Sequence, residues 1–288
     1  MIPGAFDYHR PTSVNEAALL LRQLGEDARP LAGGHSLIAL MKLRLAMPEH
    51  LVDLSGVDGL KGVRREGDDL VIGAMTTQHD IIHDAMLAES LPILRETANQ
   101  IADPQVRYRG TIGGNVANGD PGNDMPAVMQ CLDARFRIAS PDGEREISAR
   151  DFYHGAFDTE LHRGDIVTEI RIKAPPRGHG YAYEKMKRKT GDYATAAAAV
   201  ILTLEGGRCA RASVALTNVA DTPLWAEEAS KILAGSDLGK ETLDRAAAAA
   251  EAITNPASDL HGPAEFRAKM AGVMLRRAVM RAQARAKA

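Results

Sequence analysis

The order of apolar and polar residues predicts helices and strands in turn over the first part of the chain. Helical spacing is clearest in Val14–Leu24, where Thr12 or Ser13 can act as the N-cap and Gly25 as the stop. Alternating apolar residues on either side of a turn predict two hairpins, at residues 63–75 and 135–148. Further helices are expected at residues 35–45, 76–88 and 89–101, and further strands at residues 29–32, 51–54 and 165–173.

A different pattern begins after Pro175 and Pro176. Three strands are predicted in succession, at residues 181–188, 194–204 and 208–219, and helices follow at residues 225–233, 240–253 and from residue 263 onward. Strands followed by helices are typical of an α+β domain. We therefore place a domain boundary at the two prolines, between residues 1–176 and 177–288.

Residues 102–124 show neither the spacing of apolar residues that is typical of a helix nor the alternation that is typical of a strand. Gly, Asn, Asp and Pro are frequent in this segment, which predicts one long loop. Loops of this length inside a folded domain are usually functional, so the segment is a candidate binding region.

Composition excludes several classes of partner. The 288 residues include 35 Lys and Arg against 38 Asp and Glu, and the net charge of −3 provides no field that would attract nucleic acid or an acidic membrane. The longest apolar run, residues 194–204, is shorter than the ~20 residues of a membrane span. The first residues show no signal-peptide pattern. We expect a soluble, cytoplasmic protein without a membrane span or a nucleic-acid partner.

The cysteine and histidine content predicts no metal site. Two cysteines, Cys131 and Cys209, cannot form a four-cysteine zinc site or hold an iron–sulfur cluster without another chain, and we expect both to be small buried side chains. His79 and His83 have the spacing of a zinc-binding helix, but no glutamate adjoins the first and no third ligand is evident. We interpret them as a solvated helix face.

Two glycine segments carry the candidate chemistry. The first glycine segment is residues 32–36 (AGGHS), and the second glycine segment is residues 111–115 (TIGGN). Consecutive backbone N–H groups can form a concave site for a diphosphate, and glycine avoids a Cβ that would strike the phosphate oxygens. The first segment also precedes a predicted helix, whose N-terminus favours an anion. For either segment taken singly, a structural role in a tight turn remains the alternative.

The sequence lacks the two common motifs that bind a nucleotide through a single glycine-rich loop. The chain contains no G-x-x-x-x-G-K-[ST] motif, and no G-x-G-x-x-G motif follows a strand. Two separate glycine segments that hold one diphosphate therefore favour a flavin dinucleotide site of another kind.

These segments, the following Asp124 and residues 189–194 (KTGDYA) resemble the FAD-binding subunits of the xanthine dehydrogenase, or molybdenum hydroxylase, family. The resemblance covers essentially the whole chain, and within the family it is to the flavoprotein subunits of aerobic carbon monoxide-oxidising enzymes. A flavin subunit of a xanthine- or aldehyde-oxidising enzyme, a free-standing flavin reductase or oxidase of the same broad fold, and a non-enzymatic nucleotide-binding protein remain as alternatives.

The resemblance implies an α+β fold of the vanillyl-alcohol-oxidase (PCMH) type. It has two α+β subdomains, about residues 1–56 and 57–176, and a C-terminal domain with a three-stranded antiparallel sheet and a helix bundle. It also implies noncovalent FAD, although His35 lies where a covalent flavin link, as found in distant relatives, would have to be considered.

The resemblance also implies a set of cofactor-binding residues. The two glycine segments and Leu37 would hold the diphosphate and ribityl chain, and Ile166 or Val167 would adjoin the adenine. Lys185 and Asp192 would approach the flavin ring, and Tyr193 would cover its face as a gate. The full set is Ala32, Gly33, Gly34, His35, Ser36, Leu37, Ile101, Ala102, Thr111, Ile112, Gly113, Gly114, Asn115, Asp124, Ile166, Val167, Lys185, Asp192 and Tyr193.

No catalytic acid, base or nucleophile is implied, because electron transfer through a flavin requires only binding and tuning of the ring. The implied partners are a small subunit with [2Fe-2S] clusters and a large subunit with the molybdopterin cofactor, in a dimer of heterotrimers. Carbon monoxide would be oxidised to carbon dioxide on the large subunit, and a quinone-type acceptor would receive the electrons. The resemblance leaves a peripheral association of the complex with a membrane open.

Overall fold

The N-terminal part forms a small parallel sheet with one helix beside it. The structure, a computed structural model, describes residues 2–287. Strands β1 (Asp7–His9), β3 (His50–Asp53) and β2 (Ala28–Leu31) pair in that order. Helix α1 (Val14–Leu24) has the predicted bounds, because the Ser13 side chain accepts a hydrogen bond from the Glu16 N–H and Gly25 ends the helix with a φ of 67°. Helix α2 is shorter than predicted (Leu37–Lys42).

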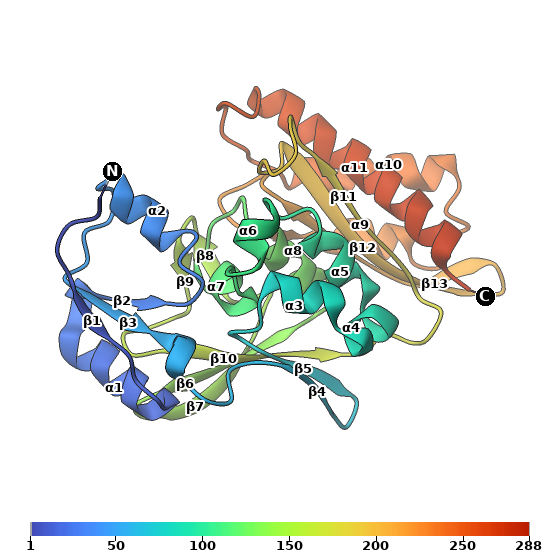
Figure 1. Ribbon diagram of the computed structural model, residues 1–288. Helices are drawn as coiled ribbons and strands as arrows, with labels where there is room; N and C mark the ends of the chain where they lie inside the picture. Colours follow the sequence, from blue (N-terminus) through green and yellow to red (C-terminus); the bar gives the residue numbers. More distant parts are fainter. Residues whose placement is uncertain (1, 288) are drawn as a thin grey trace.

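The second part is a five-stranded antiparallel sheet covered on one face by helices (Figure 1). Its strand order is β4-β5-β10-β6-β7, and both predicted hairpins are present. The strands are β4 (Val63–Glu66), β5 (Asp69–Gly73), β6 (Arg135–Ser140), β7 (Gly143–Ser148) and β10 (Ile166–Lys173). The short elements around them are η1 (Gly25–Asp27), η2 (Leu54–Gly56), β8 (Tyr153–Gly155) and β9 (Asp158–Thr159).

The helices of this part differ from the prediction in two places. Two long helices were expected at residues 76–101, whereas three short ones form, because Asp84 caps a new helix and Pro92 begins another. The long loop expected at residues 102–124 is wrong, because the Asp103 and Thr111 side chains cap two helices within it. The helices are α3 (Gln78–His83), α4 (Ala85–Ser90), α5 (Pro92–Ala98), α6 (Pro104–Arg107), α7 (Ile112–Ala117) and α8 (Asp124–Cys131).

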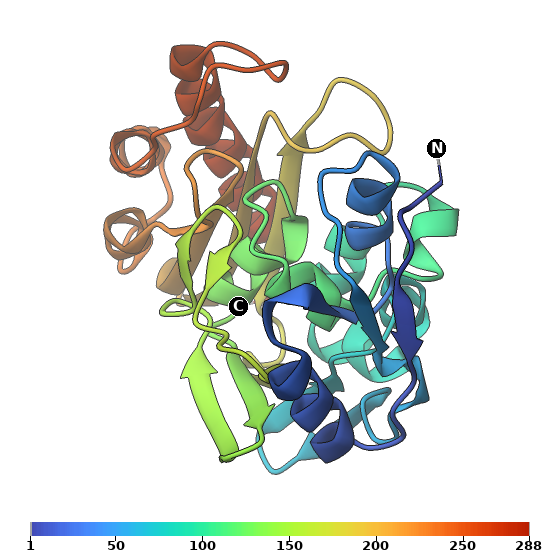
Figure 2. The ribbon, with the colours of Figure 1, turned by 90° about the vertical axis from the view of Figure 1, so that its left-hand side faces the viewer.

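The C-terminal part is an antiparallel sheet with helices on its outer face (Figures 1 and 2). The three predicted strands are β11 (Gly180–Met186), β12 (Ala196–Glu205) and β13 (Arg208–Thr217), and the short β14 (Leu224–Trp225) adds to the edge. Three helices follow, α9 (Glu227–Leu233), α10 (Lys240–Ala252) and α11 (Ala264–Arg285). Among residues 2–287, no helix combines the length and the apolar character that crossing a membrane would require.

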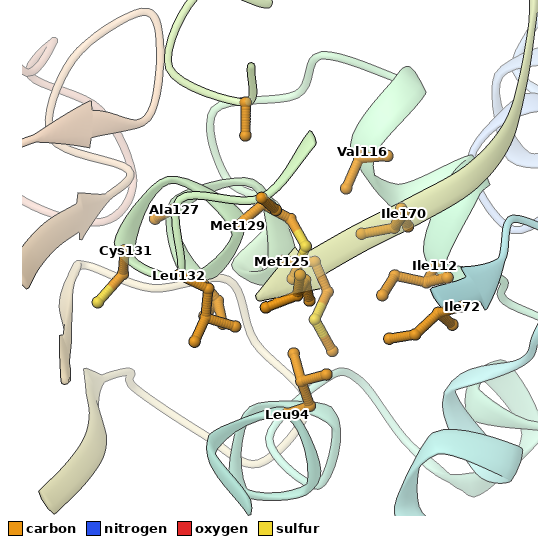
Figure 3. Packing of buried hydrophobic residues seen from close by; sticks show 14 of the residues in the cluster. Ile72, Leu94, Ile112, Val116, Met125, Ala127, Met129, Cys131, Leu132 and Ile170 are labelled. Atoms are coloured by element: carbon orange, nitrogen blue, oxygen red, sulfur yellow. The ribbon is translucent and has the colours of Figure 1, made fainter. Parts of the chain in front are cut away.

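Strand β12 explains the longest apolar run of the sequence. Ala197 and Ala199 pack into the core shared with the five-stranded sheet and helices α5 and α8, whereas Ala198 and Val200 pack against α10 and α11. A strand that is buried on both faces needs apolar residues at every position. The C-terminal sheet is therefore fixed against the rest of the molecule through a continuous core, part of which is shown in Figure 3.

Both cysteines are buried, as predicted. Burial raises the pKa of the Cys131 thiol to about 12 and that of Cys209 to about 11. At neutral pH both are protonated thiols that act as small packing residues. Within residues 2–287, no group of three or more His, Cys, Asp or Glu side chains is arranged to hold a metal ion.

Candidate functional site

A cleft of about 700 Å³ lies where the three parts of the chain meet. This volume is within the ~300–1,000 Å³ of typical small-molecule and cofactor pockets. The loop after β2, the segments around α3, α6 and α7, the start of β10 and the connection from β11 to β12 form its walls. Every site residue expected from the sequence, except Ile112, lines this cleft.

Ile112 instead lies in the hydrophobic core. Its side chain is completely buried, next to Ile72 and Ile170 (Figure 3). Its backbone N–H donates to the Thr76 carbonyl oxygen at 3.0 Å. Ile112 therefore anchors the start of α7 to the five-stranded sheet, and the neighbouring polar residues are turned toward the cleft as a consequence.

The first glycine segment offers unpaired backbone donors. The N–H groups of residues 33–37 make no hydrogen bond to any other atom of residues 2–287, and these residues are half-buried or, for His35, exposed. All five residues line the cleft. Consecutive free N–H groups form the kind of concave donor site that binds a diphosphate. This part of the chain has the donors expected from the sequence.

The second glycine segment has a different structure from the expected one. It is the first turn of α7, and its N–H groups are already used: Gly113 donates to the Ala74 carbonyl oxygen at 2.8 Å, and Gly114 donates to the Thr111 Oγ1 at 3.1 Å. A second row of free backbone donors is therefore not available here. What this segment presents to the cleft is side chains, including the amide group of Asn115.

The structural reason why Gly33 and Gly113 are glycines also differs from the expected one. A Cβ on Gly33 would not point at a ligand, because it would lie 2.7 Å from the Gly110 Cα and closer still to the Arg109 carbonyl oxygen. A Cβ on Gly113 would lie 2.5 Å from the Ala74 Cβ. The glycines let separate backbone segments pack against each other, so that the two glycine segments share one wall of the cleft. Gly34 additionally has a φ of 79°, a conformation that other residues rarely adopt.

A buried ion pair forms part of the cleft wall. Lys185 Nζ lies 2.8 Å from Asp124 Oδ2, and the Tyr183 hydroxyl donates to Asp124 Oδ1. The side chains of Lys185 and Asp124 are 1% and 5% exposed. Burial raises the pKa of the Asp124 carboxyl group, and the positive charge of Lys185 opposes this shift. Asp124 and Lys185 come from α8 and β11, and the fold brings them together.

Tyr193 lines the cleft from the connection between β11 and β12. Its side chain is 46% exposed, its hydroxyl is 3.4 Å from Asp120 Oδ2, and its ring packs against Gly122, where a Cβ would come within 3.0 Å of the ring. The preceding Asp192 has a buried Oδ2 with no hydrogen-bond partner among the described residues. That oxygen lies 3.8 Å from Arg188 Nε, an ion pair without a hydrogen bond, and the exposed Tyr193 ring beside it suits a surface that a ligand completes.

Sequence reasoning missed several lining residues, of which Gln78 is the most informative. Its side chain is 1% exposed, and neither its Nε2 nor its Oε1 has a partner among residues 2–287. Met75, Val106 and Asp165 also line the cleft. Gln78 follows Thr77, the N-cap of α3, and a lone glutamine after a cap carries no recognisable sequence signal.

The cleft thus combines free backbone N–H groups, apolar lining residues and a buried ion pair. A dinucleotide requires these features, because donors must meet its diphosphate and apolar surfaces must cover its two ring systems. The residues present fit FAD, and the fold and cleft together define a flavin-dinucleotide-binding α+β protein.

Comparisons with known proteins agree with this class. Residues 4–175 match the family described as the FAD binding domain in molybdopterin dehydrogenase, and residues 181–282 match the CO dehydrogenase flavoprotein C-terminal domain. The chain belongs to this family of FAD-binding flavoproteins of molybdopterin dehydrogenases.

Individual relatives span the whole chain. The chain is 67% identical to the carbon monoxide dehydrogenase medium chain of Afipia carboxidovorans, with 100% of each chain covered. It is 34% identical to the glyceraldehyde dehydrogenase medium chain of Sulfolobus acidocaldarius, covering 96% of this chain and 98% of the relative. A crystal structure of a Cu,Mo-CO dehydrogenase in a cyanide-inactivated form contains a chain with a TM-score of 0.99 and 67% identity, covering 99% of this chain and 100% of that one.

Proposed function

We propose that this chain is the FAD-carrying electron-transfer subunit of a molybdenum-containing carbon monoxide dehydrogenase. The observation that supports this most directly is the 67% identity to a carbon monoxide dehydrogenase medium chain over the full length. The glyceraldehyde dehydrogenase medium chain, at 34%, is much less similar. The substrate proposal rests on this difference in sequence identity.

The cleft residues divide by chemistry along its length. The free N–H groups of residues 33–37 would bind the diphosphate, and Ile166 and Val167 would adjoin the adenine. Lys185 and Asp192 would lie near the flavin ring, and Tyr193 would cover one face of it. Bound FAD supplies the capacity to take up electrons from an iron–sulfur cluster and to release two of them to a quinone-type acceptor. The chain's own residues bind the cofactor, exclude water and fix its orientation.

Partner subunits would supply the remaining cofactors. The chain has only two cysteines, both buried in its core, so an iron–sulfur cluster must come from another subunit. We propose a small [2Fe-2S] subunit and a large molybdopterin subunit, assembled as a dimer of heterotrimers in the cytoplasm. Carbon monoxide and water would yield carbon dioxide, two protons and two electrons on the large subunit, and the quinone would take up the electrons. We also propose that residues 1–176 and 177–288 are two domains, which pack against each other through the core that β12 shares with α5 and α8.

Purification through a tag on this chain tests the proposal. We expect a yellow complex with two further subunits, in which carbon monoxide bleaches the flavin absorbance and supports reduction of a soluble quinone. Bleaching by xanthine or an aldehyde, but not by carbon monoxide, would assign the chain to another molybdenum hydroxylase. Sustained turnover of reduced nicotinamide by the isolated chain would favour the free-standing flavin reductase, and a colourless chain that FAD cannot reconstitute would contradict the cofactor assignment.

The gate role of Tyr193 gives a separate prediction. The variant Tyr193→Ala should increase the quenching of flavin fluorescence by iodide, because one face of the ring loses its cover. The affinity for FAD should fall by less than about tenfold, since one aromatic contact contributes roughly 0.5–1.5 kcal/mol. Tyr108→Ala is the matched control, because Tyr108 is 59% exposed and lies outside the cleft lining. Equal quenching in the wild type and in Tyr193→Ala would refute the gate.

A further inference from the structure

Gln78 is held rigidly at the wall of the cleft by its backbone. Its N–H donates to the Gly110 carbonyl oxygen at 2.8 Å, and the preceding Thr77 caps α3 and pairs with Thr111 as an isolated β-bridge. Gly110 in turn lies against Gly33, because a Cβ on Gly33 would approach the Gly110 Cα to 2.7 Å. The backbone of Gln78 is therefore anchored, through Gly110, beside the first glycine segment.

The side chain of Gln78 is buried without partners. It is 1% exposed, and both Nε2 and Oε1 lack a hydrogen bond to any described residue. Buried amide groups are normally paired, because leaving them unpaired costs the full desolvation free energy. Gln130 is the other buried glutamine with an unpaired atom, but its Nε2 reaches the Ala149 carbonyl oxygen and it does not line the cleft. Among the described residues with an unpaired buried side-chain atom, Gln78 and Asp192 line the cleft.

The unpaired Nε2 and Oε1 of Gln78 restrict which chemical group can bind to this side chain. A carboxamide offers two N–H donors and one carbonyl acceptor. A phosphate group only accepts at neutral pH, so it would leave Oε1 unpaired, and the apolar edge of a flavin would leave both atoms unpaired. A hydroxyl group both donates and accepts, and the ribityl chain of FAD carries hydroxyl groups next to the diphosphate.

We propose that the Gln78 carboxamide is a cofactor-binding group that hydrogen-bonds to a ribityl hydroxyl of FAD. The proposal rests on the proposed function, since it requires FAD in this cleft. The location of Gln78 beside the first glycine segment, whose free N–H groups would hold the diphosphate, supports the ribityl chain over the ring, whose polar edge would meet the Lys185–Asp124 pair. Through Gln78, helix α3 would take part in binding the cofactor, although α3 contains no glycine motif.

The test compares Gln78→Met with Gln130→Met, in the assembly in which the chain purifies. Methionine keeps the length of the side chain and removes both hydrogen-bonding groups. We expect Gln78→Met to bind FAD about tenfold more weakly, the loss that corresponds to one net hydrogen bond. The melting temperature of the FAD-free form should be equal to or higher than that of the wild type, because an unpaired buried amide has been removed. The reduction potential of the bound flavin should stay unchanged. Gln130→Met should bind FAD as the wild type does.

Three results would overturn the proposal. Unchanged FAD affinity in Gln78→Met would mean that the carboxamide holds only solvent. A weakened FAD-free form would assign Gln78 a structural role, and a shifted reduction potential would place the contact on the flavin ring instead of the ribityl chain. Absence of FAD binding by the wild type would refute the proposed function itself, so the two failures are distinguishable.

Discussion

Replacing Gly33 with alanine is expected to weaken FAD binding by about a hundredfold, equivalent to about 2.8 kcal/mol. The new Cβ would collide with the backbone of Arg109 and Gly110, which no side-chain rotation can relieve. Overpacking of this kind typically costs about 1–3 kcal/mol, and here the least costly response is to separate the two segments that form the cleft wall. Titration of the FAD-free protein with FAD, followed by fluorescence quenching, measures the change.

The control is Gly155→Ala. A Cβ there would be 3.6 Å from the Asp158 Cβ, which is ordinary van der Waals contact. This variant should bind FAD as the wild type does. Wild-type affinity in Gly33→Ala would show that the close packing of Gly33 against Arg109 and Gly110 does not shape the cofactor site.

Replacing Lys185 with methionine is expected to lower the free energy of unfolding by about 3–5 kcal/mol, because it leaves the Asp124 carboxylate buried without a counter-charge. Urea unfolding measures the loss. The double variant Asp124→Asn with Lys185→Met removes both charges and should recover much of this loss, since a buried ion pair contributes little net stability relative to neutral groups of similar volume.

The loss in Lys185→Met should also depend on pH. Burial already raises the pKa of Asp124 in the folded protein, and removal of Lys185 takes away the charge that opposes this shift. The folded state then binds more protons than the unfolded state between the two pKa values, so stability falls as pH rises through that interval. The deficit relative to the wild type should be smaller near about pH 5 than near about pH 8. An equal deficit at both pH values would contradict a charged, unpaired Asp124.

Local signals predicted most individual elements. The cap at Ser13 and the stop at Gly25 define α1, and the turn at Pro141 and Asp142 joins β6 to β7. The segment 102–124 was predicted wrongly, because its helices are only four and six residues long and too short to show a hydrophobic period. Asp103 and Thr111 were available as cap signals and would have indicated them.

The sequence predicted which segments line the candidate site, but it did not predict which of their groups are free to bind a ligand. Both glycine segments line one cleft, but only the first presents free N–H groups, and the second is occupied by hydrogen bonds to Ala74 and Thr111. Which amides remain free depends on what packs behind them, and a sequence motif does not contain that information. Gln78 was missed for the same reason, because its importance comes from the partners it lacks.

The sequence by itself determined the secondary structure over most of the chain, the family resemblance and the set of segments that matter. These follow from short-range rules, since caps, turns and hydrophobic periods act over a few neighbouring residues. Only the tertiary structure decided that Gly33 meets Gly110, that Lys185 neutralises Asp124 and that the Gln78 side chain is left without a hydrogen bond. Such contacts join residues far apart in the chain, and their energies depend on burial, which exists only once the three parts have packed together.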